Sequence, residues 1–201
     1  VSSVTNMNWL FAYAKEFNQA LDNWDVSKVI DMGGMFLRAA KFNQPLNSWD
    51  VLNVANMNRM FAKAINFNQA LNDWDVSSVT DMCDMFRNAE KFDQALNSWN
   101  VSNVTRMSVM FSGAEKFNQA INNWNVSNVT NMENMFEDAI AFKTKFNNGN
   151  SLTGFTDELK VWFKSDRMLA IDIKEREKDN LDNFYNNLES LYNNLDKENR
   201  N

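Results

Sequence analysis

Residues 72–96 read NDWDVSSVTDMCDMFRNAEKFDQAL, and this unit recurs along the chain at a fixed step of 25 residues. Counted from two residues before each Trp, the full copies begin at Asp22, Asn47, Asn72, Asn97 and Asn122, and the last ends at Phe146. A partial copy, residues 1–21, precedes them. A period of this length is typical of arrays in which each repeat packs on its neighbours. We expect residues upstream of Val1 to cover the leading surface of the partial copy.

The spacing of apolar residues changes within each unit. Trp74, Val76 and Val79 begin with alternation and include β-branched residues, which predicts a short strand. Thr80-Asp81 is a helix N-cap signal, and Thr130 with Glu133 matches a capping box.

A second spacing follows the N-cap signal. Met82, Met85, Phe86 and Ala89 stand at i, i+3, i+4 and i+7, which is one face of a helix. Each unit is therefore predicted to be a strand, a short helix and a return turn. Stacked units would form a parallel sheet on one face, with helices as a second layer.

Several side chains recur in register and would form rows along the predicted stack. We interpret three of these rows as structural. They are the tryptophans Trp24, Trp49, Trp74, Trp99 and Trp124, the phenylalanines Phe36, Phe61, Phe86, Phe111 and Phe136, and the polar row Asn18, Asn43, Asn68, Asp93 and Asn118. The polar row, with the glutamines that follow it, is expected to bond turn backbone. The alternative is a line of ligand-binding amides. Asp25, Asp50, Asp75, Asn100 and Asn125 form a fourth row, for which the choice is turn backbone or a hard cation such as calcium.

Composition excludes several classes of function. The chain has 201 residues, a net charge of −6, no histidine and one cysteine, Cys83. No block is basic, which argues against a nucleic-acid partner or an anionic membrane. The missing histidine removes the commonest general base and transition-metal ligand. No nucleophile–base pair or phosphate-binding glycine-rich loop is evident. We therefore expect no enzymatic activity, no cofactor and no metal. No run of apolar residues is long enough for a transmembrane segment.

The repeat also resembles a known family. The string Met-Phe-x-x-Ala-x-x-Phe-Asn-Gln-x-Leu-x-x-Trp-Asp-Val-Ser-x-Val, as in residues 60–79, resembles the 25-residue repeats of mollicute surface lipoproteins, which are similar to BspA-type leucine-rich-repeat-like proteins. The resemblance covers residues 1–146. It implies an α/β, leucine-rich-repeat-like solenoid, display at the cell surface through a lipid anchor outside this chain, and a role in adhesion or host interaction. It carries over no catalytic residue.

The remaining residues do not follow the repeat. Residues 147–155 read as a linker, and residues 156–201 as a helical cap followed by an amphipathic tail. Leucines and one phenylalanine in the tail alternate at three- and four-residue steps, as in a coiled-coil seam: Leu181, Phe184, Leu188, Leu191 and Leu195. This helix either packs on the array or its cap, or joins two copies of the chain.

Positions that vary between copies are expected to face solvent, among them 33–34, 37–38 and 40–41 and their equivalents, where Cys83 also falls. In the full copies the first pair is mostly polar, with no aromatic cluster. Two functions remain. One is a non-catalytic cell-surface scaffold that binds a protein or another host-surface ligand. The other is a structural spacer, or an antigenically variable coat, with no ligand of its own.

Overall fold

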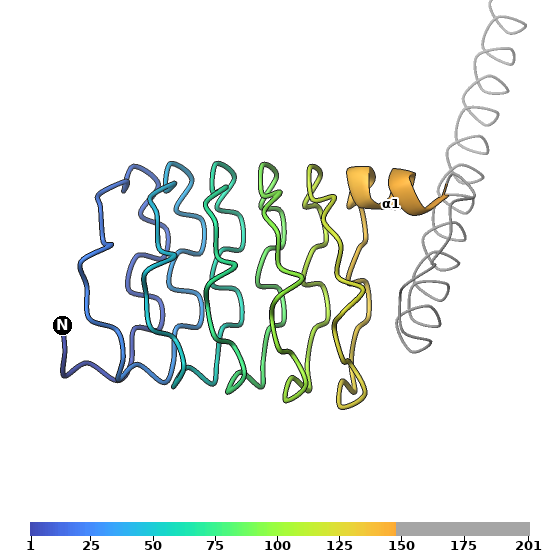
Figure 1. The fold of residues 1–201 in the computed structure, drawn as a ribbon. Helices are drawn as coiled ribbons and strands as arrows, with labels where there is room; N and C mark the ends of the chain where they lie inside the picture. Colours follow the sequence, from blue (N-terminus) through green and yellow to red (C-terminus); the bar gives the residue numbers. More distant parts are fainter. Residues whose placement is uncertain (148–201) are drawn as a thin grey trace, which may run out of the picture. The chain divides into compact units, whose positions relative to one another are not determined.

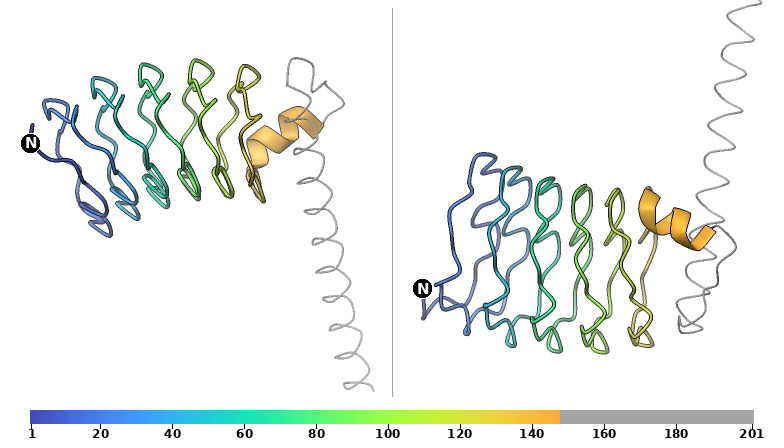
Figure 2. Two further views of the ribbon diagram at one scale, coloured as in Figure 1. Left: turned by 90° about the horizontal axis from the view of Figure 1, so that it is seen from below. Right: turned by 45° about the horizontal axis from the view of Figure 1, so that its top comes forward.

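Each 25-residue repeat forms one coil of a stack. The protein is represented by a computed structural model. The structure describes residues 1–147, with side chains to residue 144. In this part successive coils lie side by side, as Figures 1 and 2 show from three directions. We number the coils 1 to 6, and they comprise residues 1–21, 22–46, 47–71, 72–96, 97–121 and 122–146.

The strand–helix solenoid predicted from the sequence is wrong. Within residues 1–147 the one regular element is α1, Ile140–Asn147, at the end of coil 6. Neighbouring coils meet through isolated parallel bridges, one residue per coil, at Asn6, Asp31, Asn56, Asp81, Arg106 and Asn131. No sheet and no helical layer form in the part of the chain described. The predicted linker and helical tail, with the seam Leu181, Phe184, Leu188, Leu191 and Leu195, lie outside the described residues.

The segment predicted to be a helix is a series of tight turns. In coil 4 the N–H of Met85 donates to the carbonyl of Met82, and the N–H of Ala89 to that of Phe86, at 3.2 and 3.0 Å. Both bonds join residues three apart, as in a β-turn. Asp84 and Asn88, the third residue of each turn, have φ of +56° and +53°. A positive φ at this position is the mark of a type II turn.

Alternate N–H groups of this segment bond to the next coil. Met82, Asp84, Phe86 and Asn88 donate to carbonyls 24 residues further on, over 2.7–2.9 Å. Every second residue therefore links two coils, while the residues between them close turns. This pattern satisfies the backbone without helix or strand. It also turns the residues at i, i+3, i+4 and i+7 inward, since Met82, Met85, Phe86 and Ala89 are all fully buried.

The predicted strand is also a turn. The N–H of Val79 donates to the carbonyl of Val76 at 2.9 Å, so the chain reverses between them. The N-cap signal also precedes turns and not a helix. Asp81 does accept an N–H bond from residue 83, at 2.9 Å, but the chain then enters the turns and not a helix.

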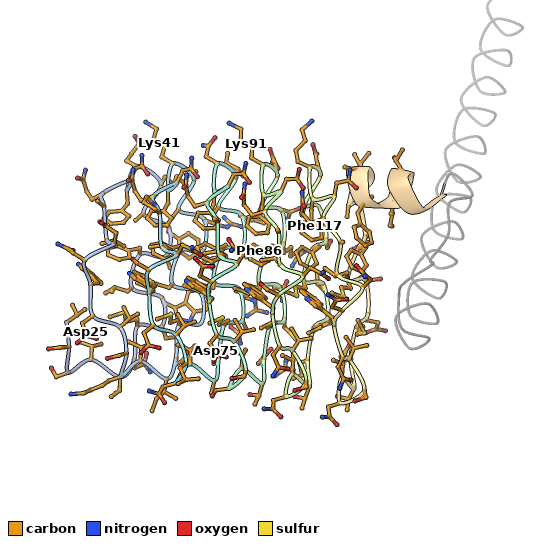
Figure 3. The ribbon with its side chains drawn as sticks, in the orientation of Figure 1. Asp25, Lys41, Asp75, Phe86, Lys91 and Phe117 are labelled. Carbon is orange, nitrogen blue, oxygen red and sulfur yellow. The ribbon has the colours of Figure 1, made fainter. Side chains whose placement is uncertain are left out.

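Stacked rings fill the interior of the coils. Phe36, Phe61, Phe86, Phe111 and Phe136 lie 5.5–5.7 Å apart in one column. A second phenylalanine in each coil, six residues on, stacks on the first at 4.0–4.2 Å. Phe86 and Phe117 are labelled within the stack in Figure 3. Burial of one such side chain stabilises by about 1.5–3 kcal/mol, so the columns are a main source of stability.

Candidate functional site

One face of the stack is built from positions at which the chain does not repeat. All positive φ angles in residues 1–147 fall at two positions per coil, in all six copies. These positions and the residue before each are the third and second residues of the turns. We call this surface the variable face. It comprises residues 8–9, 12–13, 33–34, 37–38, 58–59, 62–63, 83–84, 87–88, 108–109, 112–113, 133–134 and 137–138.

The expectation that these positions face solvent is correct only in part. Arg38, Arg59 and Arg87 are exposed. Gly33, Gly34 and Leu37 are buried, as are Cys83 and Asp84. The Cys83 sulfur lies 3.1 Å from the hydroxyl of Ser108 in the next coil. Burial raises the pKa of the Cys83 thiol, so this group is neutral and shielded.

Cationic and aromatic side chains gather over coils 1 to 4 of the variable face. We call this group the basic patch, and it consists of Trp9, Tyr13, Arg38, Arg59, Lys63 and Arg87. Trp9 and Tyr13 are 45% and 55% exposed. The ring of Trp9 lies over the backbone of Gly34, where a Cβ would stand 3.1 Å from the indole. Glycine at that point therefore makes room for the ring.

The arginines of the basic patch are held in place. The Arg38 guanidinium lies 5.4 Å from the centroid of the Tyr13 ring, a cation–π contact. The carboxylate of Asp84, itself 8% exposed, lies 3.5 Å from Arg59 Nε and 3.2 Å from Arg87 NH1. Asp84 thus orients two guanidinium groups from neighbouring coils and leaves their other N–H groups free to bind an acceptor.

These side chains border a shallow cavity of about 320 Å³, which Leu37 and Ala62 also line. Four cations and one carboxylate surround it, so its net charge is +3. The cavity combines exposed aromatic rings, an apolar floor and fixed positive charge. Chemically it suits an anionic group attached to a larger apolar or planar moiety.

The opposite end of the same face is acidic. Coil 6 contributes Glu133, Glu137 and Asp138, which we call the acidic patch. Between the two patches, the face of coil 5 consists of Ser108, Val109, Ser112 and Gly113 and has no charge. The variable face therefore runs from positive to neutral to negative along the stack.

The predicted polar row lies away from this face. The side-chain oxygen of Asn68 accepts bonds from Asp93 N and Gln94 Nε2 of the next coil, both at 2.9 Å. Asn18 and Asn43 make the same pair of contacts to their next coils. In Asp93 a carboxylate oxygen takes this place and accepts from Asn118 and Gln119. The row links coil to coil through its acceptors.

The aspartates after each Trp close turns of their own. The Asp25 carboxylate accepts bonds from the Ser27 hydroxyl and backbone N–H, at 2.6 and 3.1 Å. These bonds, the hydroxyl first, hold the pKa of Asp25 below its ordinary value. Asn125 accepts from Ser127 N–H in the same way. Asp25 and Asp75 lie along one edge of the stack in Figure 3, with Lys41 and Lys91 along the opposite edge. Within residues 1–147 no three His, Cys, Asp or Glu side chains are grouped to hold a metal ion.

The family described as "Mycoplasma protein of unknown function, DUF285" matches residues 1–78 and 66–175. The chain belongs to this family. The match supports the mollicute assignment and the repeat character of the chain, while the family description names no activity. No curated protein and no solved structure matches the chain. Within residues 1–147, the helix present falls short of the length and apolar character needed to span a bilayer.

Sequence reasoning missed the basic patch of this DUF285 protein for a specific reason. Comparison of the five full copies leaves out Trp9 and Tyr13, which belong to the partial copy. The pair 33–34 and its equivalents include Arg59 but not Arg38, Lys63 or Arg87, which lie at the pair 37–38 and its equivalents. Aligning all six copies at both pairs would have shown the cluster, because stacked repeats bring equivalent positions together.

Proposed function

We propose that this chain is a non-catalytic binding module of the mollicute cell surface, and that its basic patch binds an acidic segment of a partner protein. The observation that supports this most strongly is the gathering of exposed Trp9 and Tyr13 with four cations on the face that does not repeat. The surface location, a lipid anchor outside this chain and a role in adhesion or host interaction rest on the resemblance to mollicute surface lipoproteins.

The composition of the patch supports a protein partner. Trp, Tyr and Arg are the residues that contribute most at protein interfaces, and here they lie around one cavity. Arg59 and Arg87 are already oriented by Asp84, and Arg38 by Tyr13. Because these side chains lose little freedom on binding, less of the interaction energy is spent on ordering them.

Charge supports an acidic partner. The whole chain carries −6, so a general attraction to anions is absent. The patch is a local exception, with a net charge of +3 around its cavity. Carboxylates are the groups that an arginine fork binds in bidentate fashion. Binding should therefore weaken as salt is raised, because the exposed charges are screened.

The test is a titration with poly-L-glutamate as the acidic peptide, with heparin in parallel. The variant Arg59→Asn/Lys63→Asn should lose most of its affinity for poly-L-glutamate. Asparagine occupies the equivalent positions in other coils, as Asn134 in coil 6 for position 59 and Asn88 in coil 4 for position 63, so the fold tolerates it. The matched control is Lys91→Asn/Lys116→Asn, which removes the same charge elsewhere. Equal losses in both variants, or binding of heparin alone, would contradict the proposal.

One observation favours the spacer as a second candidate. Equivalent backbone bonds between coils differ little in length, as Phe36, Phe61, Phe86 and Phe111 each donate to the next coil at 2.8–2.9 Å. The contacts between neighbouring coils are therefore equivalent along the stack, as a spacer that gains or loses whole coils requires. A spacer predicts that removal of residues 72–96 leaves function intact and that no substitution on the variable face matters. A binding module predicts the reverse, because this deletion removes Asp84 and Arg87.

A further inference from the structure

The variable face is complementary to itself. Its charges by coil are +1 in coil 2, from Arg38, +2 in coil 3, from Arg59 and Lys63, and −3 in coil 6, from Glu133, Glu137 and Asp138. In coil 4 Arg87 is cancelled by Asp84, and coil 5 is uncharged. Charges of opposite sign are thus separated by two neutral coils on one surface.

We propose that this face pairs with the same face of a second copy of the chain, in antiparallel orientation, so that coil 3 of each copy lies against coil 6 of the other. The proposal rests on the proposed function, because it names the partner whose acidic residues meet Arg59 and Lys63 of the basic patch. The two copies are related by a two-fold axis that lies in the plane of the interface, at right angles to the stack and between coils 4 and 5. Such an axis matches coil 3 with coil 6 and coil 4 with coil 5, which makes the interface isologous.

The axis also matches positions within the coils. Because the axis runs at right angles to the stack, the first positive-φ position of a coil faces the first positive-φ position of the matched coil in the other copy. The second positions face each other in the same way. Lys63 of one copy then faces Asp138 of the other, since both are at the second position. Arg59 faces Asn134, with Glu133 beside it. Two symmetric sets of opposite charges result, and no like charges are brought together.

The centre of this pairing permits close approach. Gly113 and Ser112 add little bulk, and Val109 supplies one half-buried apolar side chain beside the axis. The acidic patch remains available, because Glu133 and Asp138 are exposed and Glu137 has one weak contact, 3.4 Å from the Ser112 hydroxyl. Ion pairs formed here replace few internal bonds.

The size of the interface sets its strength. Four coils spaced about 4.8 Å apart give a contact roughly 20 Å long. The pair is therefore smaller than a standard interface and belongs with weak, transient contacts below about 1,200 Å². Such a contact forms where copies are crowded, as on a surface that displays many of them, because effective concentration replaces affinity.

The test is sedimentation velocity of the full chain over a wide concentration range, at low and high salt. The basic-reversed variant is Arg59→Glu/Lys63→Glu, and the acid-reversed variant is Glu133→Lys/Asp138→Lys. Each alone places like charges opposite each other and should weaken self-association by about tenfold or more. An equimolar mixture of the two should recover association to near the wild-type level, because every opposed pair is again of opposite sign. The tail is the same in all samples and cannot produce this recovery.

Thermal melting of each variant confirms that it is folded. An absence of concentration dependence in the wild type, or a mixture that associates no better than its parts, would overturn the pairing. Titration with poly-L-glutamate separates this failure from failure of the proposed function. The acid-reversed variant keeps its basic patch and should bind poly-L-glutamate at least as well as the wild type. If it binds but self-associates normally, the binding site stands and the pairing falls. If the basic-reversed variant still binds poly-L-glutamate, the site itself is wrong.

Discussion

The indole N–H of Trp99 donates to the carbonyl of Leu71, 2.9 Å away and 28 residues earlier in the chain. Trp49, Trp74 and Trp124 make the equivalent bond at 2.8–2.9 Å. The rings of Trp74, Trp99 and Trp124 also stack at 6.4–6.5 Å, with planes 3° apart. Each tryptophan therefore joins its coil to the preceding ones through both its ring and its polar atom.

This arrangement predicts a large effect of Trp99→Ala. Trp99 is 3% exposed, so the substitution leaves a cavity between coils and should lower the free energy of unfolding by about 3–5 kcal/mol. Trp24→Ala is the comparison, because Trp24 is only partly buried and should cost less. Chemical denaturation measures both. Equal losses would show that burial does not set the contribution of this row.

A second prediction concerns the polar row. Asn68→Ala removes the acceptor for two half-buried donors of the next coil, and should cost about 1–2 kcal/mol. Asn68→Asp is the matched control, because Asp93 makes the same contacts with a carboxylate. Thermal melts should place the aspartate variant near the wild type and the alanine variant well below it. If the aspartate variant melts as low as alanine, the row does not act through its acceptor oxygens.

The sequence allowed the burial pattern to be predicted but not the backbone. Met82, Met85, Phe86 and Ala89 are buried, as a helical face would be. Yet two type II turns in succession also turn the first and last residue of each turn inward, which produces the same spacing. The two structures differ in where the N–H groups bond, and apolar spacing carries no information about that. A sequence signal lay at the third turn residue, where Gly34, Asn88, Gly113 and Asn134 favour a positive φ.

The site was harder to predict than the stack. The repeat shows which positions pack, because burial imposes the same residue on each coil. It does not show how Arg59 and Arg87, 28 residues apart, share the carboxylate of Asp84. That contact depends on which outward positions become neighbours, and this follows from the turns.

A third prediction concerns Val109, a β-branched residue at φ +61°. The left-handed region costs such a residue about 1–2 kcal/mol, and glycine avoids this cost. Part of the gain is offset by the greater freedom of glycine in the unfolded chain, about 0.5–1 kcal/mol. Val109→Gly should therefore raise the free energy of unfolding by about 0.5–1 kcal/mol. Val104→Gly, at a fully buried position outside these turns, should instead destabilise. Destabilisation of similar size in both would contradict the strain at Val109.

A fourth prediction concerns acid. Because the Ser27 bonds lower the pKa of Asp25 in the folded chain, its ionised form stabilises the fold above the unfolded pKa, about 3.9. This contribution is lost as the pH falls through the folded pKa. Asp25→Asn introduces the residue that coils 5 and 6 carry at this position, Asn100 and Asn125. The variant should be less stable than the wild type at pH 7 and equal to it in strong acid. Urea denaturation at both pH values gives the difference. If the difference in unfolding free energy between the wild type and Asp25→Asn is larger in acid than at pH 7, the stabilising role of the Asp25 carboxylate is contradicted.

The most direct test of the central claim is the thermal midpoint measured with and without poly-L-glutamate, since a ligand that binds the folded state raises it. Phe61→Leu changes a repeating position and Arg59→Asn/Lys63→Asn two non-repeating positions of the same coil. We predict that Phe61→Leu, which loses about 1–2 kcal/mol of packing, melts lower but shows the wild-type shift. Arg59→Asn/Lys63→Asn should melt like the wild type and show no shift. A shift that survives in Arg59→Asn/Lys63→Asn and disappears in folded Phe61→Leu would contradict the division between positions that build the stack and positions that bind.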